Sequence, residues 1–184
     1  MSKPSSGHFK GTTGGHFAPN YQFTNELRNA IIKKDGLDLR EHPTKYKQLS
    51  SKKLKLLRKK KLNRTITKSE YNHLEWQRRL NNRRNKAIID FWKNEKRRII
   101  SKLPTTRNWS ATQQQYILSD KRPKYAGKSI VSHHTYSVAK YPHLANRSEL
   151  IYPATQYEHI YRWHGGNTRK SLPGIPINPL KEQF

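Results

Sequence analysis

Five histidines near the C-terminal end are the residues of this sequence best suited to chemistry. They fall within 32 positions and are His133, His134, His143, His159 and His164. The neutral imidazole of histidine binds divalent cations through a ring nitrogen, and its ordinary pKa near neutrality also lets it take up a proton. The cluster therefore suits a metal site, a general base, or both.

Two of these histidines are adjacent, in the stretch IVSHHTYSV, among apolar and β-branched residues that are typical of a strand. Side chains that follow each other on an extended chain point to opposite faces. One interpretation is that the inward-facing imidazole is a hydrogen-bonded core residue. The other is that both faces are used for chemistry, so that one imidazole binds a cation and its neighbour is free to take a proton.

Three consecutive elements must position these histidines. The residue pattern predicts a strand or hairpin from 129 to about 138, a loop over KYPHLANRSELIYP, and a helix over ATQYEHIYRWH that ends at Gly165-Gly166. A histidine pair on a strand, followed by a loop and a helix with further histidines, is the layout of a single-metal ββα site. In that layout one strand histidine and the helix histidines converge on the ion.

Helices are predicted upstream of this segment. The strongest pattern runs from 67 to about 102, where Thr67 and Glu70 have the spacing of a capping box and apolar residues recur every three or four positions. Four arginines lie on the opposite side, and a break near Asn81-Asn82 is left open. A shorter helix follows in NWSATQQQYIL, with Ser110 as its N-cap.

The predicted fold class is α+β, with a mostly helical N-terminal part and a small ββα-metal core near the C-terminus. Residues 1–20 are rich in glycine and serine and are expected to form a flexible leader. Residues 21–103 are expected to form a basic helical region that includes a short helix over Thr24–Lys34. Residues 104–184 would hold the core, with an extended, proline-spaced tail that wraps it.

Charge is the dominant feature of the composition. Of the 184 residues, 38 are lysine or arginine and 12 are acidic, which gives a formal net charge of +26 and predicts a polyanionic partner. Nucleic acid is the leading candidate, ahead of an acidic protein or an anionic membrane.

The absence of cysteine excludes disulfides and thiolate metal sites. No apolar run approaches the length of a membrane span or resembles a signal peptide, so we expect a soluble chain.

The stretch SHHTYSVAKYPHLANRSELIYPATQYEHIYRWHGGN resembles the GHH-signature branch of the HNH/endonuclease VII nucleases. These are ββα-metal DNases that often form the C-terminal toxin domains of bacterial polymorphic toxins. The resemblance extends over residues 105–179 because NWSATQQQYILSDKRPKYAGKSIV is similar to the helix and turn before the histidine pair. Ser132 replaces the usual glycine of the signature. Glu149-Leu150 stand where the superfamily often has asparagine, with Asn146 nearby.

The resemblance implies a role for each histidine of the motif. His133 would be a metal ligand, His134 the general base that activates water, His164 a second ligand, and His159 a third ligand or a phosphate contact. The cofactor would be one divalent metal ion, Mg²⁺, Mn²⁺ or Zn²⁺. On a regular α-helix the side chains of His159 and His164 would point about 140° apart. Their convergence therefore requires the last helical turn to distort before Gly165.

Four further residues near the motif are candidates for holding phosphates of the substrate, and His143 is interpreted as a structural histidine. The candidates are Arg162, Asn167, Arg169 and Lys170.

The resulting hypothesis is a metal-dependent endonuclease, acting on DNA and with RNA also considered, that serves as a bacterial toxin effector. It would be secreted as cargo of a larger toxin, would act in the target-cell cytoplasm, and would meet an acidic cognate immunity protein. The alternative is a non-catalytic, basic nucleic-acid-binding protein with structural histidines. A membrane-active protein is disfavoured because the basic tract lacks a sustained amphipathic face.

Overall fold

The computed structural model describes residues 36–42 and 44–184. The expected leader (1–20) and the expected helix over Thr24–Lys34 lie outside the described residues. Helices precede the strands along the chain, and the α+β class is confirmed. The elements are α2 (Ser51–Leu62), α3 (Lys68–Ile100), α4 (Ala111–Leu118), β1 (Lys124–Tyr125), β2 (Lys128–Ser129), β3 (Val131–His134), η1 (Pro142–Leu144), η2 (Ser148–Leu150), β4 (Ile151–Ala154) and η3 (Glu158–Trp163).

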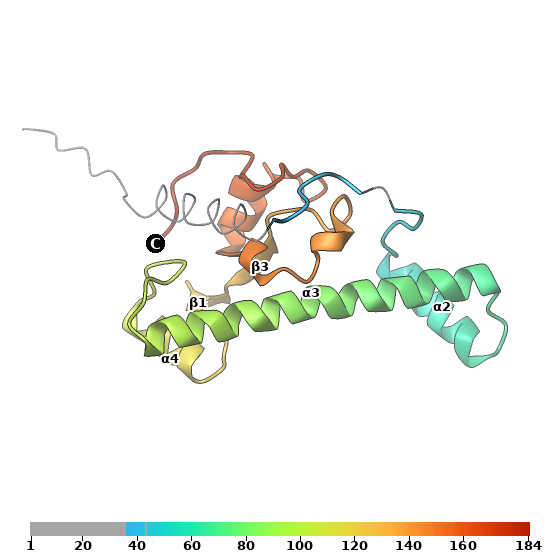
Figure 1. Ribbon diagram of the computed structural model, residues 1–184, viewed down its shortest axis with the longest axis horizontal. Helices are drawn as coiled ribbons and strands as arrows, with labels where there is room; N and C mark the ends of the chain where they lie inside the picture. The colour runs from blue at the N-terminus through green and yellow to red at the C-terminus, as the bar shows by residue number, and fades with distance from the viewer. Residues whose placement is uncertain (1–35, 43) are drawn as a thin grey trace, which may run out of the picture.

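The long helix α3 runs along most of the molecule and supports the rest of the fold (Figure 1). Its predicted capping box is present, because the Thr67 side chain accepts from the Glu70 N–H while the Glu70 carboxylate accepts from the Thr67 N–H. The helix is continuous through Asn81-Asn82, so no break occurs there. One face is buried along its length, at Leu74, Gln77, Leu80, Ala87, Phe91 and Glu95.

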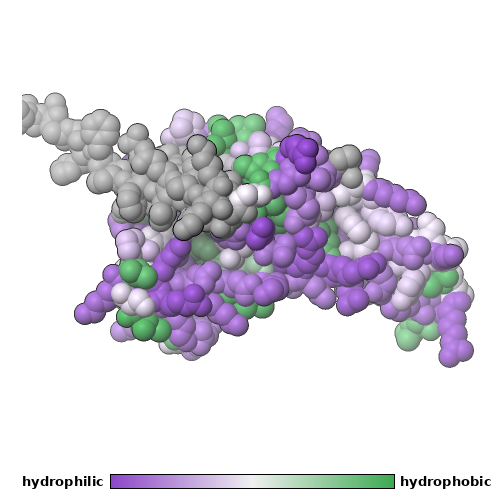
Figure 2. All heavy atoms as spheres, viewed as in Figure 1, coloured by the Kyte–Doolittle hydropathy of each residue, from purple (hydrophilic) through white to green (hydrophobic). Residues whose placement is uncertain are grey.

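Helix α2 lies beside the N-terminal end of α3, at the end of the molecule away from β3 (Figure 1). It buries Leu57, and two ion pairs join it to α3, Lys60 to Glu70 at 2.7 Å and Lys61 to Glu75 at 3.1 Å. The visible face along α2 and α3 is mainly hydrophilic (Figure 2). We refer to residues 51–84 as the basic helical pair.

A two-stranded antiparallel sheet, β3 and β4, carries the adjacent histidines. His133 pairs with Tyr152 and His134 with Ile151. Ile151 packs against α3, whereas Tyr152 packs against Trp163 of η3, so the two faces of the sheet are covered by different helices. The side chain of His133 therefore lies on the face of the sheet that η3 covers, and the side chain of His134 lies on the face that α3 covers.

The prediction of a loop through Pro153 was wrong in part, because β4 occupies the end of that segment. Proline has no N–H to donate and is rare inside strands, which made the sequence look irregular there. In a sheet of only two strands, an edge is always available, and Pro153 lies opposite Ser132. The rest of the segment forms the short 3₁₀ turns η1 and η2.

Helix η3 is anchored by a buried ion pair at its first residue. The Arg107 guanidinium donates to both Glu158 carboxylate oxygens, at 2.6 and 2.9 Å, and both side chains are fully buried. Arg107 also donates to the Phe184 carbonyl and lies 3.8 Å from the Phe184 ring centre. The tail after Gly166 contains no helix or strand and is bound to the core by these contacts and by Glu182, which pairs with Arg162.

Candidate active site

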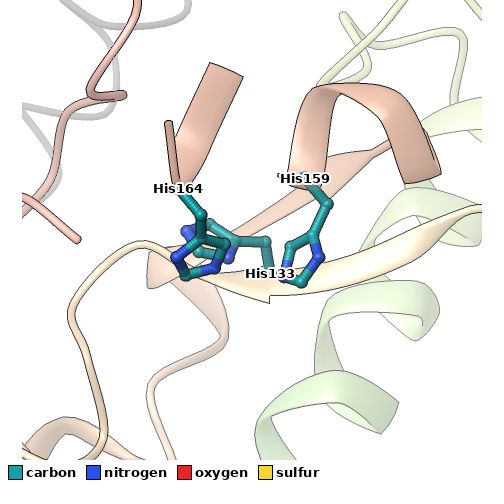
Figure 3. A group of neighbouring side chains, drawn as sticks. All are labelled: His133, His159 and His164. Carbon is teal, nitrogen blue, oxygen red and sulfur yellow. The ribbon is translucent and has the colours of Figure 1, made fainter. Parts of the chain in front are cut away.

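Three histidines converge on the η3 side of the sheet: His133 from β3, His159 from η3, and His164 directly after η3 (Figure 3). Each ring offers one nitrogen atom as a ligand, and these three nitrogens all lie within 4.8 Å of one another. The ring centres are 5.1 Å apart for His133 and His159, 5.0 Å for His133 and His164, and 4.7 Å for His159 and His164. We call these three residues the histidine triad.

The convergence of His159 and His164 follows from the unusual form of η3. This helix is a π-helix, in which hydrogen bonds connect residues five apart instead of four. Residues five positions apart therefore come to lie nearly above one another, which removes the angular separation expected for a regular α-helix. The distortion that the sequence required before Gly165 is present, and π turns are frequent at functional sites.

The surroundings of the triad orient its rings. His133 is 6 % exposed, and its ring centre lies 4.6 Å from that of Trp163. His164 is buried, and its Nδ1–H donates to the Lys170 carbonyl, which leaves Nε2 as the available ligand atom. A backbone carbonyl that receives the second ring N–H is the usual outer partner of a metal-binding histidine.

Burial and the nearby His164 ring lower the pKa of His159 below its ordinary value. The imidazole of His159 is therefore in its neutral, metal-binding form at pH 7. Three imidazoles suit a divalent cation, which binds histidine nitrogen at about 2.0–2.1 Å. The three ligand atoms lie within 4.8 Å of one another, so the triad could hold one metal ion.

His134 lies on the other face of β3, towards α3. Its Nε2–H donates to the Ala145 carbonyl at 3.3 Å, so the neutral ring keeps Nδ1 as an acceptor. Burial, and then the positive charge of Arg84, lower the pKa of His134 to about 4. The ring is consequently neutral at pH 7, with Nδ1 unprotonated.

Arg83 holds the segment that supplies the Ala145 carbonyl. Its guanidinium donates to the His143 carbonyl at 2.6 Å and to the Asn146 side chain at 2.9 Å. Ala145 itself is fully buried against Leu80. The long helix thus fixes the backbone that orients His134. His143 has the structural environment expected for it, because its Nε2–H donates to the Asp38 carbonyl at 2.7 Å.

The four expected phosphate contacts divide into two groups. Arg162 is not available at the surface, contrary to expectation, because it is 2 % exposed and its charge is paired with Glu182 at 3.0 Å. Its place on the inner side of η3 explains this burial. Asn167, Arg169 and Lys170 are exposed in the turn that follows His164, where the Asn167 side chain accepts from the Arg169 N–H.

Sequence reasoning missed the two backbone carbonyls that orient His134 and His164. Ala145 and Lys170 contribute through the main chain, so their side-chain types carry no signal for this role. The ion pair between Arg107 and Glu158 was also missed, because its partners are 51 positions apart. A buried charged pair of this kind becomes recognisable only when the surrounding elements are placed.

A two-stranded antiparallel sheet followed by a short helix, with histidines from both directed at one point, defines the ββα-metal class of site. The comparison of the sequence with protein families agrees with this class: residues 74–155 match the family described as GHH signature containing HNH/Endo VII superfamily nuclease toxin. This match agrees with the resemblance that the histidine motif implied. By its description, the matched family is part of a nuclease superfamily.

The family match includes His133 and His134 and ends before His159 and His164. The assignment of the last two to the site thus depends on the geometry of η3. No curated protein and no solved structure matches the chain. Within the part of the chain that the structure describes, no helix is both long and apolar enough to cross a membrane.

Proposed function

We propose that this chain is a metal-dependent endonuclease that hydrolyses phosphodiester bonds in DNA. The observation that supports the proposal best is the convergence of His133, His159 and His164 beside His134, on a domain of a nuclease family. His133 and His134 occupy successive positions of one strand and face different sides. The adjacent imidazoles can therefore have the two roles that hydrolysis requires.

In this reaction His134 is the general base. Its Nδ1 takes a proton from a water molecule as the water oxygen bonds to phosphorus, and the bond from phosphorus to one ester oxygen breaks. The departing oxygen is protonated by solvent. His133, His159 and His164 would hold a divalent cation, which as a Lewis acid stabilises negative charge on the phosphate and on the departing oxygen. The hydrogen bond to the Ala145 carbonyl keeps Nδ1 of His134 free for its role.

The donor set favours a transition-metal ion. Magnesium prefers oxygen ligands in octahedral geometry, whereas zinc and related ions readily accept imidazole nitrogen. The triad offers three imidazoles and is not accompanied by a carboxylate within its cluster in the described residues. We therefore propose Zn²⁺ in preference to Mn²⁺ and Mg²⁺. Titrating metal-free protein with each ion by calorimetry tests this order without any activity measurement.

The basic helical pair supplies a surface for the DNA backbone outside the cleavage site. Lys52, Lys53, Lys55 and Lys59 are all exposed on α2, and the whole chain carries a net charge of +26. Such contacts with phosphates are independent of base sequence and weaken steeply as the salt concentration rises.

The biological role proposed is that of a toxin effector, because the matched family is one of nuclease toxins. The domain would be delivered as part of a larger secreted polypeptide and act in the cytoplasm of the target cell. A cognate immunity protein would protect the producing cell. The net charge of +26 favours an acidic one through electrostatic complementarity.

The direct test incubates purified protein with supercoiled plasmid and, in parallel, with total RNA, in EDTA and with Mg²⁺, Mn²⁺ or Zn²⁺. We expect cleavage of the plasmid with metal and none in EDTA. His134→Ala should abolish it, whereas His73→Ala, which removes a histidine from α3 outside the site, should not. Salt-sensitive binding without cleavage under every metal would instead support the non-catalytic nucleic-acid-binding protein.

A further inference from the structure

Arg84 lies on the face of α3 that packs against the β3–β4 sheet. It is four residues after Leu80 and three before Ala87, which are both buried, so it shares their side of the helix. Leu80 packs against Ala145, the residue whose carbonyl orients His134. Ala87 packs against Ile151, the strand partner of His134. Arg84 is thus placed between the two segments that surround the imidazole of His134.

The guanidinium of Arg84 has no anionic partner among residues 36–42 and 44–184. No ion pair involves it, and its Nε–H is buried without a hydrogen bond. Burial also lowers its pKa below the ordinary value. The buried guanidinium of Arg107, by contrast, is paired with Glu158. A partly buried cation without a partner is unfavourable in the free protein, which suggests that its anion comes from outside the chain.

We propose that Arg84 binds a non-bridging oxygen of the phosphate that is cleaved. The inference rests on the proposed nuclease function and names a further residue for the same reaction. Guanidinium offers several donors in a planar fork that matches the geometry of phosphate oxygens. As water attacks phosphorus, negative charge grows on these oxygens, and a donor already in position stabilises it without reorganisation.

This role distinguishes Arg84 from its neighbour Arg83. The guanidinium of Arg83 is already used to hold the backbone near Asn146, so it has a structural function in the free protein. Arg84 lies beside the general base, makes no such bond, and is more buried than exposed arginines of α3 such as Arg97. The buried polar residues of this face, Gln77 and Glu95, have hydrogen-bond partners within the protein, whereas the buried Nε–H of Arg84 has none.

The test compares Arg84→Gln and Arg84→Lys with the matched control Arg97→Gln, which removes the same charge from an exposed position of the same helix. We expect Arg84→Gln to lower kcat for a short DNA duplex by about 100-fold, as for loss of one transition-state donor. Lysine should recover part of the rate. Millimolar guanidinium chloride, compared with equal NaCl, should partly restore Arg84→Ala.

Melting temperature and metal affinity distinguish a phosphate-binding role of Arg84 from a structural one. Because Arg84 has no partner in the free protein, Arg84→Gln should melt at the same temperature as the wild type or higher, and should bind Zn²⁺ with unchanged affinity. A lower melting temperature, with a proportional loss of activity and no response to guanidinium, would show that the residue is structural. Kinetics of Arg84→Gln within twofold of Arg97→Gln would also overturn the proposal.

Binding measurements separate this proposal from the proposed function. If the wild type cleaves no nucleic acid under any metal, the nuclease assignment fails. Fluorescence anisotropy with a labelled duplex in EDTA then still decides the role of Arg84. Weaker binding by Arg84→Gln than by Arg97→Gln supports a phosphate contact, whereas equal affinity of the two variants overturns it.

Discussion

At the scale of single residues, the site depends on the way each imidazole is oriented by the backbone. The Lys170 carbonyl accepts from Nδ1–H of His164, and the Ala145 carbonyl accepts from Nε2–H of His134. These bonds direct opposite ring nitrogens of the two histidines towards their functions. The proposed roles, metal binding for His164 and proton transfer for His134, use the ring nitrogens that these bonds leave free.

His159 provides the sharpest prediction at this scale, because its sequence position allowed either a ligand or a phosphate contact. Its place in the triad favours the role of a ligand. His159→Ala should lower the affinity for Zn²⁺ by more than about 100-fold, since even the loss of an outer partner costs about 10–100-fold. Calorimetric titration of metal-free protein measures this. An unchanged metal affinity together with a raised KM for DNA would identify a phosphate contact instead.

At the scale of elements, the helix η3 positions two ligands of the triad and is itself anchored by Glu158. Burial alone would raise the pKa of Glu158, but hydrogen bonds from Arg107 outweigh this effect, and the net pKa lies below its ordinary value. A carboxylate with a lowered folded pKa stabilises the protein above the pKa of the unfolded chain. That stability is lost as the pH falls through the folded value.

Replacing this carboxylate should therefore change both stability and its pH dependence. Glu158→Gln should lower the free energy of unfolding at pH 7 by about 3–5 kcal/mol, because it leaves Arg107 buried without its partner. The difference from the wild type should shrink as the pH falls below about 4.3, the ordinary pKa of glutamate, towards the lower pKa of folded Glu158. Urea denaturation between pH 3 and 7 measures both effects, with the exposed Asp120→Asn as the control. A difference that is independent of pH would contradict the role of this ion pair.

Several of these elements could be predicted from sequence, since their signals are local. The capping boxes at Thr67 and Ser110 and the strand at His133-His134 follow from neighbouring residue types. Strand β4 was missed because Pro153 argued against it. The π-helix was missed because helical periodicity assumes 3.6 residues per turn. Arg84 was expected with the other three arginines opposite the apolar stripe, and this was wrong, because its spacing from Leu80 and Ala87 puts it on the buried side of α3.

At the scale of the whole molecule, the basic helix α2 and the candidate active site occupy different regions. The triad lies between the β3–β4 sheet and η3, whereas α2 lies at the far end of α3 (Figure 1). Helix α3 connects the two regions. Leu80 and Ala87 of α3 pack against Ala145 and Ile151 near the candidate active site, whereas Glu70 is paired with α2. A duplex held along α3 would thus be bound by the basic helical pair and cleaved near the sheet.

Neutralising α2 should weaken DNA binding without removing the chemistry. Changing Lys52, Lys53, Lys55 and Lys59 together to glutamine should reduce the salt dependence of binding, by up to about 0.9 in the slope of log K against log salt for each phosphate that α2 no longer neutralises. Anisotropy titrations over a range of NaCl concentrations measure this slope. Saturating DNA should restore kcat. A slope equal to that of the wild type would show that the duplex binds elsewhere.

The central claim is that adjacent imidazoles divide metal binding and proton transfer between them. The most direct measurement determines Zn²⁺ binding and plasmid cleavage in parallel for wild type, His133→Ala and His134→Ala. We predict one bound ion and cleavage for wild type, one bound ion without cleavage for His134→Ala, and neither for His133→Ala. Cleavage by His134→Ala at the wild-type rate, or undiminished metal binding by His133→Ala, would contradict the claim.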